Sequence, residues 1–277
     1  MFGYDDNVLS GNSDRWNFKE INEIIDTAEK RFNEIVAPIK DNSYLCLLNE
    51  SFAKSVLYMR EILVLLYNGF PDGAMTLGKD IYETMIILSF FEKNKEDENL
   101  LDRYFDNLNI KLIGDSVQLL NFLNSGADDE TVKAGINDML SQKKRNYKAF
   151  KDKHNETVGD KGFKSYWWIG DILPEPSHSF NGLHKDSEWY NTIFRHIYNI
   201  ASHQGHSSLV SADNESPVAM QTLPTTEGFN LPVCFTLTAF CNIFRIVFFN
   251  YDIEYKDLDK KCEEIIKPLF AEIWKEE

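Results

Sequence analysis

Apolar residues recur at intervals of three and four over most of the chain, which is the spacing of residues on one face of an α-helix. In the first such segment they are Phe18, Ile21, Ile25, Ala28, Phe32 and Ile35. The same spacing predicts helices over residues 42–67, 74–93, 98–123, 129–153, 187–207, 231–250 and 255–274. No segment shows the alternation of apolar and polar residues that is typical of a β-strand. The sequence therefore predicts an all-α fold, a multi-helix bundle of about eight helices.

Turn-forming residues mark where several of these helices end. NGFPDG at 68–73 and SGADDE at 125–130 combine glycine with proline or with an N-capping aspartate. Pro38 ends or bends the first helix, which Asp14 is placed to cap. We also expect the long helix that contains Gly114 to be broken or loosened at that residue.

Residues 154–186 differ in character from the rest, since they hold several glycines, prolines, tryptophans and histidines and lack a helical repeat. We interpret them as a long ordered loop with short turns, and such long connections are often functional. Residues 1–15 are polar and are expected to form a flexible tail. Residues 16–277 are interpreted as a single helical domain.

The charge balance limits the partners that the chain can bind. Its net charge is −15, which repels both a phosphate backbone and an anionic membrane leaflet. A local exception is KKRNYKAFKDK at 143–153, where basic residues are interleaved with Tyr147 and Phe150. Such a stretch can hold single-stranded RNA, although a solvated helix face is its ordinary meaning. With 43% hydrophobic and 13% aromatic residues, the chain can build a core.

Cysteines and apolar runs indicate the compartment. The four cysteines, Cys46, Cys234, Cys241 and Cys262, are widely spaced, and three of them lie inside apolar helical patterns, as expected of free thiols rather than of disulfides. The N-terminus has no basic and apolar segments of a signal peptide, and the apolar run IILSFF at 86–91 is too short to span a bilayer. We expect a soluble cytoplasmic protein, bacterial by default, with no membrane association.

Glu83 is the first candidate for chemistry. It shares a face of its predicted helix with Ile86, Ile87 and Phe90, and Lys79 precedes it by one turn. A carboxylate on an apolar face is unfavourable unless a partner compensates for its burial. Glu83 is therefore interpreted as part of a functional site, the alternatives being a structural ion pair with Lys79 or a side of the helix that faces water.

The helix predicted over 187–207 has one apolar and one polar face. The apolar face holds Ile193, Phe194, Ile197, Ile200 and Ala201, and the polar face holds Arg195, Tyr198, Asn199, Ser202 and His206. The polar face has no Glu or Lys, which dominate ordinary exposed faces. We therefore predict a catalytic cluster of Glu83, Arg195, Tyr198, Ser202 and His206, against the alternative of a solvated face.

All six histidines lie between residues 154 and 206. His203 and His206 are three residues apart, so both could bind one metal ion, with Glu83 or His178 as a third ligand. Their spacing is not that of the HExxH zinc motif, and our prediction is that no cofactor is bound, with a divalent metal as the alternative.

Ser202 and His206 lack a GxSxG context for a nucleophilic serine, so a serine that fits a helix contact is the simpler interpretation.

Four segments resemble a bacterial domain-of-unknown-function family, DUF5677, over about residues 45–210. They are NGFPDGAMTLGKDIYETMIILSFF, LLDRYFDN, YWWIG and YNTIFRHIYNIASHQGHSS. The resemblance implies an all-α fold in which Glu83 and His206 approach each other, and it implies no known reaction. Carried over residue by residue, it points to Lys79, Glu83, Arg103, Tyr104, Trp168, Tyr198, Ser202 and His206. The family more often has arginine where this chain has Lys79. The two-point contact of an arginine with the Glu83 carboxylate therefore becomes a simpler contact from the lysine ammonium.

A looser similarity is to helical bundles of the HEPN class, many of which are RNases that use an arginine and a following histidine. Here Arg195 and His203 are separated by seven residues, and His196 follows the arginine directly, so the spacing departs from that pattern. An RNase would use histidine as general acid or base and arginine to neutralise phosphate.

Three hypotheses follow from the sequence. In the first, the protein is a bacterial stress or phage-defence effector that cleaves RNA through the predicted cluster, with Lys79, Arg103, Tyr104, Trp168 and His203 contacting the substrate. In the second, it is a non-catalytic module that binds a small ligand, or a protein partner through its acidic surface. The third is metal-dependent hydrolysis. A homo-oligomer is compatible with each of them.

Overall fold

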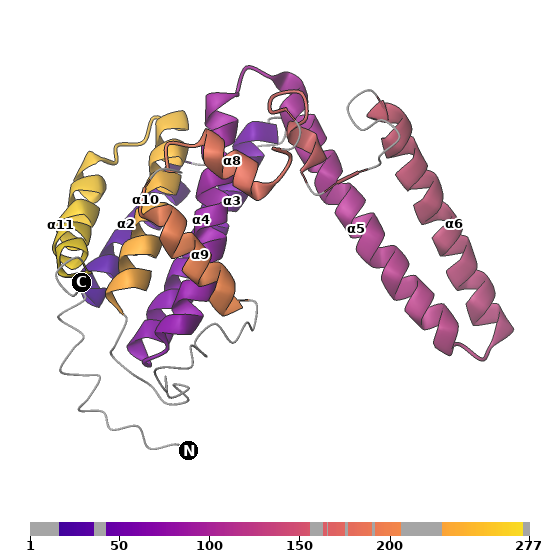
Figure 1. The fold of residues 1–277 in the computed structure, drawn as a ribbon, viewed down its shortest axis with the longest axis horizontal. Coiled ribbons are helices and arrows are strands. Elements are labelled where there is room, and N and C mark those ends of the chain that lie inside the picture. Colours follow the sequence, from indigo (N-terminus) through magenta and orange to yellow (C-terminus); the bar gives the residue numbers. More distant parts are fainter. Residues whose placement is uncertain are drawn as a thin grey trace, which may run out of the picture. The chain divides into compact units, whose positions relative to one another are not determined.

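The computed structural model describes residues 17–35, 43–155, 163–164, 166–174, 177–189, 192–205 and 229–273 (Figure 1). Within these ranges the chain forms nine α-helices and one short 3-10 helix, and no strand. The helices are α2 Phe18–Ile35, α3 Ser43–Tyr67, α4 Pro71–Lys93, α5 Glu98–Gly126, α6 Glu130–Lys153, α8 Phe180–Asp186, α9 Phe194–Gly205, α10 Asn230–Asn250 and α11 Lys256–Ile273, with η2 at Trp167–Ile169. The all-α prediction is confirmed. Asp14, Pro38 and His206 lie outside the described residues.

The chain divides into two compact units. Residues 1–92 and 187–277 form the first, and residues 93–186 form the second. The first unit contains α2, α3, α9, α10, α11 and nearly all of α4, whereas the second contains α5, α6, η2 and α8. That residues 16–277 make a single domain stays a prediction from the sequence.

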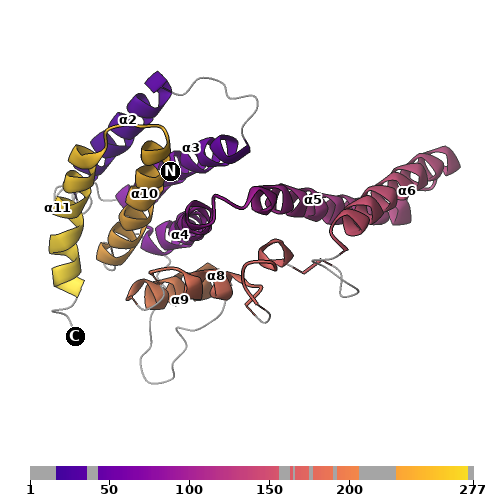
Figure 2. The ribbon, with the colours of Figure 1, turned by 90° about the horizontal axis from the view of Figure 1, so that it is seen from above.

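Helix α10 is the core helix of the first unit. It contacts α2, α3, α9 and α11, and Figure 2 shows it running beside α11, α2 and α3. Phe240 and Phe248 on α10 pack on Phe52 of α3, with ring centroids 6.3 and 5.7 Å apart. Phe52 also packs on Phe32 of α2, at 4.5 Å. A helix that is apolar nearly all round is stable only when neighbours cover most of it, and here they do.

The same helix has the length and composition of a membrane span. Its most apolar stretch is, however, 72% buried inside the protein. Core helices of folded proteins meet the same criteria, so this is weak evidence for a span.

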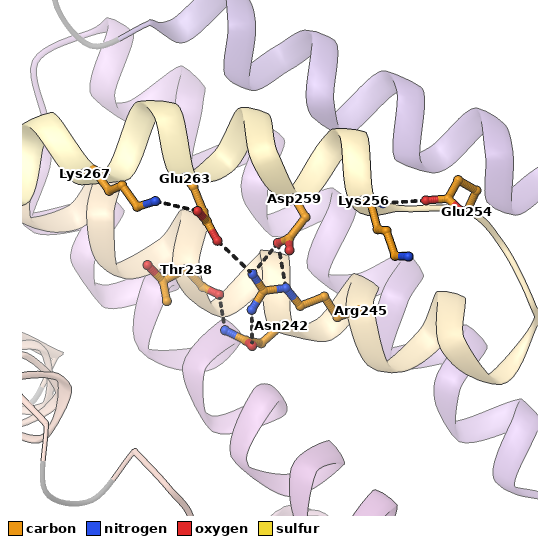
Figure 3. Close-up of polar contacts among 8 residues, drawn as sticks. All are labelled: Thr238, Asn242, Arg245, Glu254, Lys256, Asp259, Glu263 and Lys267. Atoms are coloured by element: carbon orange, nitrogen blue, oxygen red, sulfur yellow. Dashed lines mark hydrogen bonds and ion pairs between the residues drawn. The ribbon is translucent and has the colours of Figure 1, made fainter.

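A charged network ties α10 to α11 (Figure 3). Nε of Arg245 donates to Oδ1 of Asp259 at 2.6 Å, and a second guanidinium nitrogen contacts the same oxygen. The guanidinium also donates to Oδ1 of Asn242 at 3.2 Å. Glu263 lies 3.9 Å away and accepts a hydrogen bond from Lys267 at 2.6 Å. Because one arginine contacts side chains from both helices, it holds their relative register.

Helices α4 and α10 approach closely where Gly78 meets Thr236. A Cβ atom built on Gly78 would lie 2.4 Å from Cγ2 of Thr236, far inside van der Waals contact. Thr236 itself is buried and bonds to the carbonyl of Pro232 in its own helix. The absent side chain of Gly78 is therefore what allows the two helices to pack at this distance.

The second unit is built around the antiparallel helices α5 and α6. Leu120, Ile136 and Leu140 form a small apolar cluster between them. The side chain of Asp129 caps α6 by accepting from the backbone N–H groups of Thr131 and Val132, as the SGADDE segment predicts. The unit therefore has a small core of its own.

The predicted break at Gly114 is wrong, since α5 runs without interruption from Glu98 to Gly126. One glycine inside a helix is unfavourable by only about 1 kcal/mol relative to alanine. The packing of α5 against α6 offsets that amount.

Two boundaries between residues 154 and 207 also differ from the prediction. Part of the predicted loop is helix α8, in which a Cβ on Gly182 would lie 1.8 Å from the carbonyl oxygen of Ser177. This glycine permits a close backbone approach rather than ending a helix. The next helix begins at Phe194 instead of 187, because the hydroxyl of Thr192 accepts from the backbone N–H of Phe194.

All four cysteines are free thiols, and Cys234, Cys241 and Cys262 are buried, as expected from their apolar settings. Burial raises the pKa of Cys241 well above its ordinary value, which keeps the thiol protonated and unreactive. These cysteines therefore act as small apolar core residues.

Candidate functional site

Glu83 on α4 and Tyr198 on α9 are in direct contact. The Tyr198 hydroxyl donates to Oε1 of Glu83 at 2.8 Å. Nζ of Lys79, one turn earlier on α4, lies 3.8 Å from the same oxygen. The Glu83 side chain is 30% exposed and that of Lys79 is 17% exposed. The predicted pairing of Glu83 with Lys79 is present, and Tyr198 adds a second partner from a distant part of the chain.

A stack of aromatic rings beside this contact holds α9 against α4. Tyr82, next to Glu83 in sequence, is fully buried, and its ring centroid lies 5.7 Å from that of Tyr198. It also stacks on Phe194 of α9 at 6.3 Å and on Phe235 of α10 at 4.8 Å. Burial raises the pKa of Tyr82, so this phenol stays neutral. The apolar side of α9 thus fixes the helix, and its polar side delivers the Tyr198 hydroxyl to Glu83.

The two oxygens of Glu83 differ in their surroundings. Oε1 interacts with Tyr198 and Lys79. Oε2 has no hydrogen-bond partner in the part of the chain that the structure describes. A carboxylate that is oriented through one oxygen and open at the other can accept a proton or a hydrogen bond from a bound molecule. The hydrogen bond from Tyr198, 115 residues away in the chain, is what distinguishes this carboxylate from an ordinary ion pair between residues four apart.

The other predicted members of the cluster are placed to different extents. Arg195 is exposed on α9, and Ser202 is half-buried two turns further along the same helix. The backbone of His203 lies in α9, but the structure does not describe its side chain, and His206 lies beyond the described part of α9. The approach of His206 to Glu83 therefore stays a prediction.

Arg103, Tyr104 and Trp168 meet within the second unit. The Arg103 side chain is 6% exposed, and its guanidinium contacts Oδ2 of Asp97 at 3.0 Å and Oδ2 of Asp171 at 2.9 Å. Its Nε donates to the backbone carbonyl of Trp168 at 3.0 Å. The rings of Tyr104 and Trp168 meet edge to face, with centroids 4.9 Å apart. These contacts hold the η2 segment against α5, and a role in substrate binding stays a prediction.

The metal hypothesis gains no support from the described residues, which contain no group of three or more His, Cys, Asp or Glu arranged to hold a metal ion. His178 is close to the carbonyl oxygen of Leu173, at 2.8 Å from its Nε2. The side chains of His203 and His206, on which the hypothesis depends, are outside the described set.

The basic segment 143–153 forms the C-terminal half of α6 and is largely exposed. Tyr147 is exposed, and its ring packs edge to face on Phe163 at 5.5 Å. This is the arrangement of a solvated helix face. Binding of RNA to it stays a prediction.

The sequence did not predict the cluster of Asp106, Lys153 and His154 in the second unit. Oδ2 of Asp106 on α5 lies 2.7 Å from Nε2 of His154 and 2.7 Å from Nζ of Lys153. The sequence interpretation placed His154 only at the start of a loop and assigned no role to Asp106. The usable signal was Asp106 itself, a charged residue on the inner side of an amphipathic helix.

Comparison with known proteins identifies a family. The model of a family of unknown function, DUF5677, matches residues 45–216, which is more than half of the 277 residues. No curated protein matches the chain. No solved structure matches it either.

Proposed function

The chain belongs to the DUF5677 family, and from the geometry of its Glu83 site we propose that it cleaves RNA. We place it as an effector of a bacterial stress or phage-defence system that acts in the cytoplasm. The observation that carries the proposal is the oriented carboxylate of Glu83, held at one oxygen by Tyr198 at 2.8 Å and open at the other. The biological setting rests on the looser similarity of the sequence to HEPN bundles.

In this proposal each side chain has one role. Oε2 of Glu83 accepts the proton of the ribose 2′-hydroxyl as its oxygen bonds to phosphorus. Tyr198 and Lys79 position the carboxylate from its other oxygen. Arg195, exposed on α9, neutralises the phosphate. The bond from phosphorus to the 5′-oxygen then breaks, and the leaving oxygen takes a proton from His206, a role assigned from the sequence alone.

The test is a cleavage assay of the purified full chain on single-stranded RNA. Glu83→Gln removes the base and keeps the shape of the side chain, so we expect cleavage to fall by a factor of about 100 or more, the usual contribution of general base catalysis. Cleavage by His206→Ala is expected to fall by a similar factor. Glu61→Gln, at an exposed position on α3, is the matched control and should cleave like the wild type. Wild-type rates in both Glu83→Gln and His206→Ala would exclude this mechanism.

A second candidate function is a non-catalytic module that binds a small ligand or a protein. The observation in its favour is that Lys79 and Tyr198 already occupy one oxygen of Glu83, as in a structural tie between α4 and α9. Thermal unfolding of Glu83→Ala separates the two candidates. A large loss of stability, with no cleavage by the wild type, supports the binding module, whereas a stable variant that has lost cleavage supports the enzyme.

A further inference from the structure

A polar cavity of about 510 Å³ lies in the second unit, at the end of α6. Its walls include Arg103, Lys153, His154 and three aspartates, Asp102, Asp152 and Asp171, together with two asparagines. Cavities that hold small molecules usually measure about 300–1,000 Å³. The cavity therefore has the size of a small-molecule site, and its lining is polar and charged throughout. None of its lining residues belongs to the Glu83 site of the first unit.

The cations of this cavity are already engaged by the protein. The guanidinium of Arg103 interacts with Asp97, Asp171 and the carbonyl oxygen of Trp168. Nζ of Lys153 lies 2.7 Å from Asp102 and 2.7 Å from Asp106. Few hydrogen-bond donors are left for a ligand, because each ammonium or guanidinium hydrogen serves one acceptor well.

The acceptors are not used up in the same way. Each carboxylate can accept about four hydrogen bonds, and Asp152 makes no ion pair or side-chain hydrogen bond with the described residues. Three carboxylates, those of Asp102, Asp152 and Asp171, line the cavity against two cations, and Asp97 and Asp106 pair with those cations from outside the lining. The cavity therefore has an excess of negative charge and of acceptor capacity.

His154 provides a fixed, buried imidazole in the same wall. It is 9% exposed and lies between Asp106, 2.7 Å from its Nε2, and the ring of Trp167, whose centroid is 4.7 Å away. Because the Asp106 carboxylate accepts a hydrogen bond, Nε2 carries the hydrogen, and Nδ1 is the ring nitrogen that remains for a ligand. Nδ1 has no hydrogen-bond partner among the described residues.

We propose that this cavity binds a small cationic ligand that carries two or more protonated amines. Its ammonium groups would donate to the carboxylates of Asp152 and Asp102 and to Nδ1 of His154. An anionic ligand such as a phosphate would instead meet carboxylates in excess and cations that are already paired. The proposal is independent of the Glu83 chemistry, and either can fail without the other.

The test is calorimetric titration of the full chain with spermidine in 0.15 M NaCl, a salt concentration that screens nonspecific attraction to the net charge of −15. We expect saturable binding that Asp152→Asn weakens by about tenfold or more, since the negative charge that strengthens the hydrogen bond to the ammonium is removed. Asp152 is exposed and makes no ion pair with the described residues, so the variant is expected to fold. Asp138→Asn, an exposed position on the same helix α6, removes the same charge away from the cavity and should bind like the wild type.

A second measurement follows the imidazole signals of His154 by NMR, assigned with His154→Gln. These signals should shift when spermidine is added to the wild type and stay in place when inorganic phosphate is added. The proposal is overturned if binding does not saturate, if Asp138→Asn weakens it as much as Asp152→Asn, or if phosphate shifts the His154 signals and spermidine does not.

Discussion

The Tyr198 hydroxyl on α9 donates to Oε1 of Glu83 on α4 at 2.8 Å, across 115 residues of sequence. Replacing Tyr198 by Phe removes only this donor, and replacing Glu83 by Ala removes the acceptor. In a double-mutant cycle we expect a coupling free energy of about 1 kcal/mol, the usual net value of such a bond. Urea unfolding of the wild type, the two single variants and the double variant measures it. A coupling within error of zero would show that the contact does not hold α9 to α4.

Gly78 is expected to resist substitution. In Gly78→Ala the new Cβ would fall 2.4 Å from Cγ2 of Thr236, and overpacking of this kind destabilises by about 1–3 kcal/mol. Gly114→Ala is the matched control, because a Cβ at that position would have no neighbouring atom within 4 Å, and better helix propensity should stabilise α5 by up to about 1 kcal/mol. The unfolding temperatures of the two variants should therefore shift in opposite directions. Equal shifts would contradict the close approach of α4 and α10.

The contact between Asp257 and Arg31 makes part of the free energy of unfolding depend on pH. Arg31 on α2 donates two hydrogen bonds to the Asp257 carboxylate, at 2.7 and 2.6 Å, and this contact lowers the pKa of Asp257 to about 2. An unfolded aspartate titrates near pH 3.9, so the contribution is complete above about pH 4 and is lost as the pH falls through about 2. The side chains are 29% and 52% exposed, so we expect only about 0.5 kcal/mol.

The check is urea unfolding of the wild type and Asp257→Asn at several pH values between 7 and 3. The difference in unfolding free energy should be constant at neutral pH and should shrink below about pH 4. Glu61→Gln, at an exposed position on α3, serves as the control. A difference that does not change with pH would mean that the Arg31 contact does not lower the pKa of Asp257.

Arg103 is expected to be the most sensitive position of the second unit. Arg103→Met would leave Asp97, Asp171 and the Trp168 carbonyl without their shared donor, and an acceptor that loses its donor inside the protein destabilises by about 1–3 kcal/mol. Arg145→Met, an exposed position on α6, should change stability little. Tryptophan fluorescence during unfolding would report the difference, and similar stabilities of the two variants would refute the anchoring role of Arg103.

Part of the candidate site was visible in the sequence. The helical spacing places Glu83 beside Lys79, and a wheel of the later helix places Arg195, Tyr198 and Ser202 on one side. The sequence placed Glu83 and Tyr198 in one predicted cluster, but it did not show that these two residues form a hydrogen bond. The Asp106–His154 contact escaped prediction because it joins residues 48 apart in the chain, and no local pattern relates such residues.

The sequence by itself determined the helical class and most helix positions, because apolar spacing and capping residues act within a few neighbours along the chain. The N-cap Asp129 and the extent of α3 are examples. Only the tertiary structure decided that Gly78 serves a helix contact, because that depends on how near another helix comes. For the same reason only the tertiary structure showed that Oε1 of Glu83 is held by Tyr198, while Oε2 has no hydrogen-bond partner among the described residues.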